Sequence, residues 1–165
     1  MKRQFGKALS AIADSIFSSV PAPECYALLE RCIASEFQVL REDPCYVDYP
    51  GVRENIAKLA ENHRLFIVSN CEKGYPELCM EKLGIGKYIQ DHLCYGDTGT
   101  SKGKIILTLM ARNNIKSAIY IDDTQGDYAA TVEAGLPFVW CTHGFGIPEG
   151  YAAKVDNFAE LLNLL

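Results

Sequence analysis

The sequence lacks both an excess of basic residues and a long apolar run. It has 16 Lys and Arg against 21 Asp and Glu, a net charge of −5, which argues against sequence-independent binding of nucleic acid. The longest uncharged stretch, Gly135–Pro148, contains Gly, Pro and His and is too short to span a bilayer. Lys7 and Asp14 interrupt the N-terminal region, so it has no signal-peptide pattern. We expect a cytoplasmic protein with no nucleic-acid or membrane partner.

The cysteines form no metal-binding or redox pattern. None belongs to a Cys-x-x-Cys pair, and no Cys/His cluster has the spacing of a zinc site. An odd number of cysteines within apolar runs predicts buried, reduced thiols in a reducing compartment. The seven are Cys25, Cys32, Cys45, Cys71, Cys79, Cys94 and Cys141.

The hydrophobic pattern divides 165 residues into two parts. Apolar residues recur every three or four positions over 5–20 and again over 28–40, which predicts a helical hairpin interrupted at Pro21 and Pro23. We expect this hairpin to occupy residues 1–45 and an α/β core to occupy residues 46–165. Internal repeats and low-complexity segments are absent from the sequence.

Helices and strands alternate in the predicted core. Short runs that are apolar on both faces, separated by helical segments, are typical of a parallel sheet covered by helices. A capping-box pattern at Asn157–Glu160 predicts the start of a last helix. We predict strands at 65–68, 92–95, 118–121 and 138–140, and helices at 52–61, 75–83, 104–112 and 127–134.

Polar side chains follow the predicted strands. Ser69 and Asn70 come after the first strand, the acidic segment Asp122–Asp127 comes after the third, and Lys102 precedes the helix between them. Ligands of parallel sheets bind beyond the carboxyl ends of the strands, so these groups are expected to converge. A hydroxyl, a lysine and several carboxylates suit a phosphate group and a divalent cation. Taken singly, Ser69 and Asn70 are also typical of a turn or a helix cap, and Lys102 of a solvated surface.

Two common nucleotide-binding motifs are absent from the sequence. The segment 99–104 resembles a phosphate-binding loop, but Thr98 stands where its first glycine is required and Ile105 follows the lysine. A Gly-x-Gly-x-x-Gly motif after a strand is missing, because Gly144-Phe145-Gly146 continues as Ile-Pro-Glu.

The order of these motifs resembles the haloacid dehalogenase (HAD) superfamily, and within it the phosphoglycolate-phosphatase-like branch. The resemblance covers Pro50 to the C-terminus and implies a three-layer, Rossmann-like parallel sheet with a partial helical cap at 1–45. Its motifs are Tyr49-Pro50-Gly51-Val52, Ile67-Val68-Ser69-Asn70, Thr98–Gly103 with Lys102, Asp122-Asp123-Thr124-x-x-Asp127, Ala134–Pro137 and Gly144–Gly146.

The resemblance implies a role for each matching residue in a small phosphorylated metabolite's hydrolysis. Ser69 and the backbone near Asn70 would bind the phosphoryl group, and Lys102 would neutralise its charge. Asp123 would bind Mg²⁺, with Asp127 supporting the metal site or orienting Lys102. Asp122 stands where many relatives have glycine, and the resemblance implies no role for it.

The family's first motif, Asp-x-Asp-x-Thr or Val, has no match before Ser69. Its first Asp is the nucleophile that attacks phosphorus, and its second is the general acid and base. Loss of a nucleophile costs a serine protease about 10⁶ in turnover. We therefore expect a truncated or inactive form of a Mg²⁺-dependent phosphatase, with weak or absent Mg²⁺ binding.

The strand that carries this motif is central in the family's sheet order, 5-4-1-2-3. Without it, two neighbouring strands would expose unpaired edges, at about 1–3 kcal/mol for each buried unsatisfied group. We therefore predict that the strands ending at Ser69 and Asp122 pair directly. The alternative is that another chain fills the gap, either in a homodimer or from a strand-donating partner.

Two other functions fit part of the pattern. One is a non-catalytic module that binds phosphate or metal or contacts a partner. The other is a receiver-like signalling domain, which also uses an acidic pair, a hydroxyl and a lysine. In that domain the acidic pair follows the first strand and the lysine the last, whereas Lys102 precedes the acidic strand here.

Overall fold

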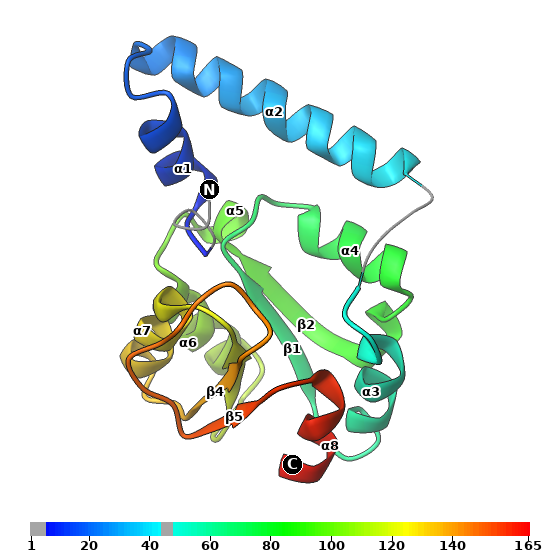
Figure 1. Ribbon diagram of the computed structural model, residues 1–165. Coiled ribbons are helices and arrows are strands. Elements are labelled where there is room, and N and C mark those ends of the chain that lie inside the picture. Colours follow the sequence, from blue (N-terminus) through cyan, green and yellow to red (C-terminus); the bar gives the residue numbers. More distant parts are fainter. Residues whose placement is uncertain (1–5, 44–47) are drawn as a thin grey trace.

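The structure, a computed structural model, describes residues 6–43 and 48–165. It is an α/β fold with two parallel sheets (Figure 1). In one sheet, β1 (Leu65–Ser69) pairs with β2 (Ile89–Cys94). In the other, β4 (Phe138–Cys141) lies between β3 (Tyr120–Asp122) and β5 (Ala153–Val155). The predicted class and the parallel pairing are confirmed.

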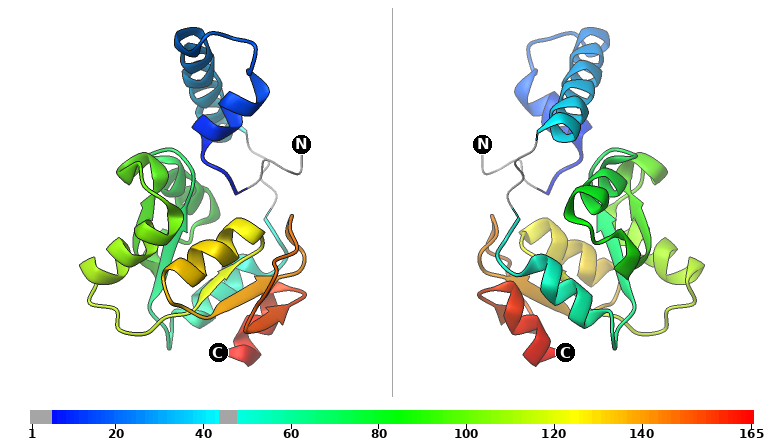
Figure 2. Two further views of the ribbon diagram at one scale, coloured as in Figure 1. Left: turned by 90° about the vertical axis from the view of Figure 1, so that its left-hand side faces the viewer. Right: turned by 90° about the vertical axis from the view of Figure 1, so that its right-hand side faces the viewer.

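Helices cover both faces of the sheets, as the apolar strands require. On one face, α6 (Lys102–Arg112) packs on β1 and β2 and against α7 (Gln125–Glu133), which packs on β3 and β4. On the other face lie α3 (Val52–Leu59), η3 (Phe158–Glu160) and α8 (Leu161–Leu164) (Figure 2). The predicted three layers are therefore present.

Each helical layer has its own hydrophobic cluster. Under α6, Leu93, Ile105 and Leu109 are buried, with Phe66 and Val68 of β1 packed against them. The opposite cluster joins the two sheets, because Leu65 of β1 and Ile121 of β3 both pack against it. Its buried members are Leu59, Val139, Cys141, Val155 and Leu161.

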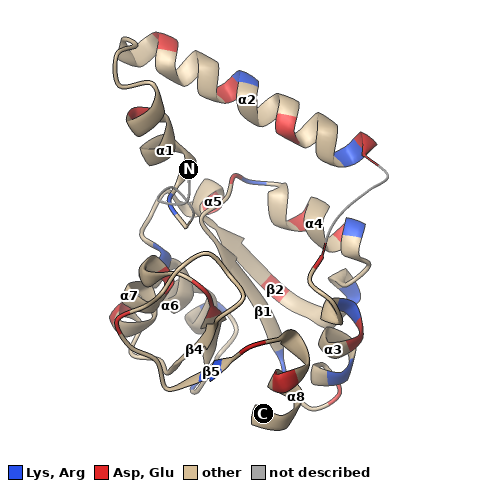
Figure 3. Cartoon of the chain, in the orientation of Figure 1, with Lys and Arg blue, Asp and Glu red and all other residues tan. Residues whose placement is uncertain are grey.

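The N-terminal hairpin consists of α1 (Leu9–Ile16) and α2 (Ala22–Glu42), which lie beyond the carboxyl ends of β1 and β2 (Figure 1). Charged residues of both signs occur along α2 (Figure 3), and Cys25 is its buried residue. One contact between the hairpin and the core is an edge-to-face pair of aromatic rings. Phe37 of α2 packs against Tyr75, the first residue of α4 (Tyr75–Leu83), with 5.9 Å between the ring centroids. The predicted boundary after residue 45 lies outside the described residues. Among the described helices, none combines the length and the apolar character needed to cross a membrane.

Several element bounds differ from the prediction. The first helix is shorter than 5–20, β2 begins at Ile89 instead of 92, and β3 begins at Tyr120 instead of 118. Pairing with β1 along its whole length defines β2, a tertiary effect that the local pattern does not contain. Three short elements were not predicted: η2 (Gly86–Tyr88), α5 (Tyr95–Thr98) and β5.

The prediction of direct pairing between β1 and β3 is wrong. The described strands form two separate sheets, and a cavity of about 850 Å³ lies between β1 and β3. The prediction assumed that the unpaired edges would be buried, but every residue of β1 and β3 is partly exposed. Partial exposure gives water access to these strands, which reduces the cost of leaving their edges unpaired.

The predicted burial of the cysteines is confirmed for three of the six that the structure describes. The six described cysteines are free thiols, and Cys25, Cys94 and Cys141 are buried. Cys71 and Cys79 are partly buried. Cys32 is exposed, so the prediction of burial is wrong for it, because its position on α2 faces away from the core. Cys45 lies outside the described residues.

Candidate functional site

Lys102 begins α6 and lies at the centre of a buried ionic cluster. Its Nζ donates to Asp122 Oδ2 at 3.3 Å and to Asp127 Oδ1, and its side chain is 9% exposed. The residue before it, Ser101, is the N-cap of α6 and has extended backbone angles. The lysine and the acidic segment, 20 and 25 residues apart, therefore meet as the sequence predicted.

The two carboxylate oxygens of Asp127 make different contacts. Oδ1 accepts a hydrogen bond from Lys102, and Oδ2 accepts one from the backbone at the start of α7. Thr124 caps α7, and its backbone N donates to Asp127 Oδ2 at 3.0 Å while its hydroxyl contacts the same oxygen. This capping box satisfies backbone donors at the start of α7 and fixes the position of the carboxylate. These contacts place one Asp127 oxygen against Lys102 and the other against the start of α7.

Asp122 ends β3 and completes the ionic cluster. Its Oδ1 accepts a hydrogen bond from Asp123 N at 3.0 Å, and its Oδ2 contacts Lys102 and the Tyr120 hydroxyl, the latter at 3.2 Å. Tyr120 was not identified in the sequence. It lies in an apolar strand, and its hydroxyl also contacts the carbonyl oxygen of Val68 on β1 at 3.2 Å.

Burial and charge act on the three groups in opposite directions. Burial raises the pKa of Asp122 and Asp127, whereas the positive charge of Lys102 acts to lower both. Burial alone would lower the pKa of Lys102, but its interactions with Tyr120, Asp122 and Asp127 outweigh burial and raise that pKa. Lys102 is therefore a cation at neutral pH, compensated by carboxylates on two elements.

Asp123 faces the loop that follows β4. Phe145 N donates to Asp123 Oδ2 at 2.5 Å, and a Cβ added at Gly144 would lie 2.2 Å from Asp123 Cβ. Gly144 therefore allows this close approach, because any side chain there would displace the carboxylate. The loop and the end of β3 thus form one edge of the site.

The three aspartates fit a magnesium ion in donor type. Asp122, Asp123 and Asp127 each offer one carboxylate oxygen, and these oxygens lie within 4.8 Å of one another. Carboxylate oxygens and water are the ligands that Mg²⁺ prefers. Lys102 contacts Asp122 and Asp127, so Asp123 is the member of the three whose contacts do not involve this lysine.

Ser69 and Asn70 lie at the end of β1 and make local contacts. Ser69 Oγ accepts a hydrogen bond from Cys71 N at 3.3 Å, and Asn70 Nδ2 donates to Gly6 O at 2.5 Å. In the described part of the chain, neither side chain is hydrogen-bonded to Lys102 or Asp123. The Tyr120 contact with Val68, the residue before Ser69, is the observed link between the two halves of the predicted site.

Comparisons with known proteins show the family to which the chain belongs. Residues 11–141 match the family model of haloacid dehalogenase-like hydrolases. This match extends over most of the chain, so the chain belongs to that family. The receiver-like alternative is set aside on this ground. A search among curated proteins found no match.

Solved structures share the fold at low sequence identity. A predicted phosphoglycolate phosphatase from Haemophilus somnus superposes with a TM-score of 0.83 at 17% identity, over 99% of this chain and 80% of the other. A predicted phosphatase from Clostridium acetobutylicum gives a TM-score of 0.80 at 19% identity, over 99% and 79%. A HAD-superfamily hydrolase, subfamily IA, variant 1, from Geobacter sulfurreducens gives 0.70 at 17%, over 94% and 71%.

Proposed function

We propose that this chain is a HAD-like hydrolase of the phosphatase type whose site binds a small phosphorylated metabolite and Mg²⁺. The observation that carries this proposal is the buried Lys102, held by Asp122 and Asp127 beside Asp123 at the carboxyl ends of the strands. Phosphoryl transfer depends mainly on positioning and on the stabilisation of negative charge. A fixed cation and a set of carboxylates supply both requirements.

Each residue has a distinct part in binding. Lys102 contributes a positive charge for phosphoryl oxygens, and Asp127 orients it. The Ser69 hydroxyl and the backbone around Asn70 supply donors from β1. Asp123 holds Mg²⁺, with Asp127 in support, and a bound Mg²⁺ neutralises charge on the phosphoryl oxygens.

We further propose that this chain alone does not complete hydrolysis. Its sequence contains no Asp-x-Asp motif, and therefore no pair that matches the family's nucleophile and general acid. Without a nucleophile, turnover is expected to fall by about 10⁶, as it does in a serine protease. Binding of phosphate and metal would remain, which is also the behaviour of a non-catalytic binding module.

Magnesium titration calorimetry and a phosphatase assay test the proposal together. Of the two expectations for Mg²⁺, weak binding or none, the proposal requires the first: the unmodified chain should bind Mg²⁺ weakly but saturably in the presence of inorganic phosphate, and D123N should lose this binding. D14N is the matched control, because Asp14 is an exposed aspartate on α1, and its binding should equal that of the unmodified chain. With para-nitrophenyl phosphate and Mg²⁺, all three proteins should show only background hydrolysis.

The two parts of the proposal fail separately. Absence of Mg²⁺ binding by the unmodified chain, or equal binding by D123N, would contradict the metal assignment. Hydrolysis that rises with enzyme concentration and is lost in D123N would contradict the proposed inactivity.

A further inference from the structure

The segment that leads into α3 is a β-turn. Residues 49–52, Tyr-Pro-Gly-Val, are closed by a hydrogen bond from Val52 N to Tyr49 O at 3.2 Å, and Gly51 has φ +80° and ψ 4°. These are the features of a type II turn, in which proline precedes a glycine with positive φ. An ion pair of 3.1 Å between Asp48 and Arg53 spans the turn. The position of Tyr49 is therefore tied to the start of α3.

The Tyr49 side chain reaches the loop that follows β4, residues 142–146, which we call the 142–146 loop. Its hydroxyl donates to the carbonyl oxygen of His143 at 3.3 Å, and its ring lies edge-to-face against the His143 imidazole with 4.6 Å between the centroids. In the part of the chain that the structure describes, His143 Nδ1 is buried without a hydrogen-bond partner. The aromatic contact, and not a hydrogen bond of Nδ1, therefore holds the imidazole. One tyrosine thus contacts both the backbone and the side chain of His143.

The next residues of the loop lie directly on Asp123 and Thr124. Phe145 N donates to Asp123 Oδ2 at 2.5 Å. A Cβ added at Gly144 would lie 2.2 Å from Asp123 Cβ, and one added at Gly146 would lie 2.9 Å from Thr124 Cα. Because no loop side chain separates these residues from Asp123 and Thr124, a displacement of the loop displaces the Asp123 carboxylate as well.

His143 is the corner of the 142–146 loop. Gly144 N donates to Cys141 O at 3.2 Å and closes a turn around it, and the Trp140 indole donates to Gly146 O at 3.2 Å at the other end of the loop. A closed turn moves as a unit, so a shift of His143 carries Gly144 with it and alters the approach to Asp123. Tyr49 contacts this corner from a different part of the chain.

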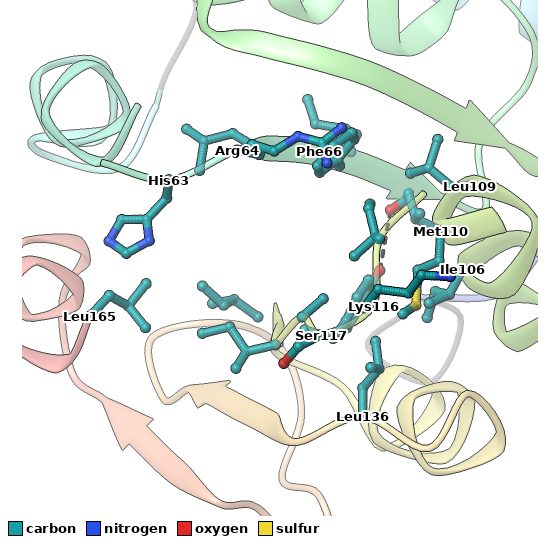
Figure 4. A pocket seen from close by; sticks show the side chains of 18 of the residues that line it. His63, Arg64, Phe66, Ile106, Leu109, Met110, Lys116, Ser117, Leu136 and Leu165 are labelled. Atoms are coloured by element: carbon teal, nitrogen blue, oxygen red, sulfur yellow. Dashed lines mark hydrogen bonds between the residues drawn. The ribbon is translucent and has the colours of Figure 1, made fainter. Parts of the chain in front are cut away.

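These contacts lie beside a smaller cavity than the one between the sheets. Tyr49, His143, Phe145 and Asp123 are among the residues that line it, and its volume is about 340 Å³. The cavity between the sheets is lined by other side chains (Figure 4), and neither Tyr49 nor the 142–146 loop is among them. A substitution of Tyr49 therefore changes its contacts with the loop without changing the lining of the larger cavity.

We propose that Tyr49 is a positioning residue for the Asp123 carboxylate and acts through the 142–146 loop. Tyr49 holds His143, and two residues further along the loop Phe145 N holds Asp123 Oδ2. A hydrogen bond to one carboxylate oxygen sets the direction of the other, and loss of such a partner typically costs about 10–100-fold in metal affinity. The consequence for Mg²⁺ rests on the proposed function, whereas the orientation of Asp123 does not.

NMR spectra without metal measure the orientation of Asp123 directly. The Phe145 amide donates to a carboxylate, and a charge-assisted hydrogen bond of this kind moves the proton resonance downfield. We expect the resonance to move upfield in Y49A, and by a smaller amount in Y49F, which loses the hydroxyl and keeps the ring. D123N weakens the same bond and should move the resonance in the same direction, so it serves as the reference.

Mg²⁺ titrations in inorganic phosphate, followed by the same spectra, measure the consequence for binding. We expect the dissociation constant to rise about tenfold in Y49A and about threefold in Y49F. Y26A is the matched control, because Tyr26 on α2 is 50% exposed and Tyr49 is 45% exposed. Y26A should titrate as the unmodified chain does, and circular dichroism should show that all of these variants are folded.

Three results would overturn the inference. These are an unchanged Phe145 resonance in Y49A, equal Mg²⁺ dissociation constants for Y49A and the unmodified chain, and equal losses in Y26A and Y49A. If the unmodified chain binds no Mg²⁺, the metal assignment fails by itself. The Phe145 resonance then decides the inference, which stands if the resonance moves in Y49A and falls if it does not.

Discussion

Lys102 shows how a single buried residue depends on its surroundings. It is compensated by Asp122 from the end of β3 and by Asp127 from the first turn of α7. Taking charges out of water is costly, so this cluster is weak evidence of net stabilisation. Removal of one partner is different, because it leaves buried charges of one sign without compensation.

We expect K102M to lower the free energy of unfolding by about 3–5 kcal/mol at pH 7, since the buried Asp127 and the partly exposed Asp122 lose their cation. The pKa of Asp122 and Asp127 is raised in the folded protein by burial, even with Lys102 present. A raised carboxyl pKa favours the folded state below the unfolded pKa of about 3.9, and this advantage is lost as pH rises through the folded pKa. The defect of K102M should therefore be smaller at pH 4 than at pH 7.

Urea unfolding followed by circular dichroism at both pH values measures this difference. K104M is the control, because Lys104 is an exposed lysine in the same helical turn, and it should change stability by less than about 0.5 kcal/mol. A K102M defect that is equal at the two pH values would show that loss of packing, and not loss of charge, is its cause.

At the scale of elements, the start of α7 links helix formation to the site. The residues Thr124-x-x-Asp127 form a capping box, which the sequence analysis did not predict and which the contacts of both side chains show. The same spacing places Asp127 on the first turn, facing Lys102. Local capping chemistry therefore positions a residue of the candidate site.

We predict that T124A lowers the free energy of unfolding by about 1 kcal/mol, as is typical when a helix N-cap is lost. T124S keeps the hydroxyl and should restore most of this stability. Chemical denaturation of the three proteins measures the effect. A T124S defect as large as that of T124A would indicate that the methyl group, and not the cap, is responsible.

The bounds of the elements show where local reasoning works. The helix predicted near 75–83 is α4, and its ends are clear because Gly74 and Gly84 flank it with left-handed backbone angles. The strand β5 was missed, because three residues, Ala-Lys-Val, carry no periodic signal. It forms because β4 offers an edge for pairing, which is a tertiary condition.

At the scale of the whole molecule, the fold consists of two sheets that share their helical layers. The α6–α7 contact and the cluster around Leu59 and Val139 join the two sheets, while the facing strands β1 and β3 are not paired with each other. Backbone hydrogen bonding should therefore be uneven across the molecule.

We predict faster amide hydrogen exchange at the cavity-facing positions of β1 and β3 than in β4, which pairs on both sides. Exchange followed by NMR measures the difference. Uniform protection along β1 would mean that its second edge is paired in solution.

The sequence by itself determined the α/β class, the family resemblance and the convergence of Lys102 with Asp122 and Asp127. It could do so because strand periodicity is a local property of the sequence. The convergence of the site follows from topology, since parallel strands present their carboxyl ends at one edge of the sheet. Only the tertiary structure decided that Asp122 pairs with Lys102, that Tyr120 links the two sheets and that β1 and β3 stay apart. These outcomes depend on the distance between strands, which the packing of the helical layers sets and which no single segment encodes.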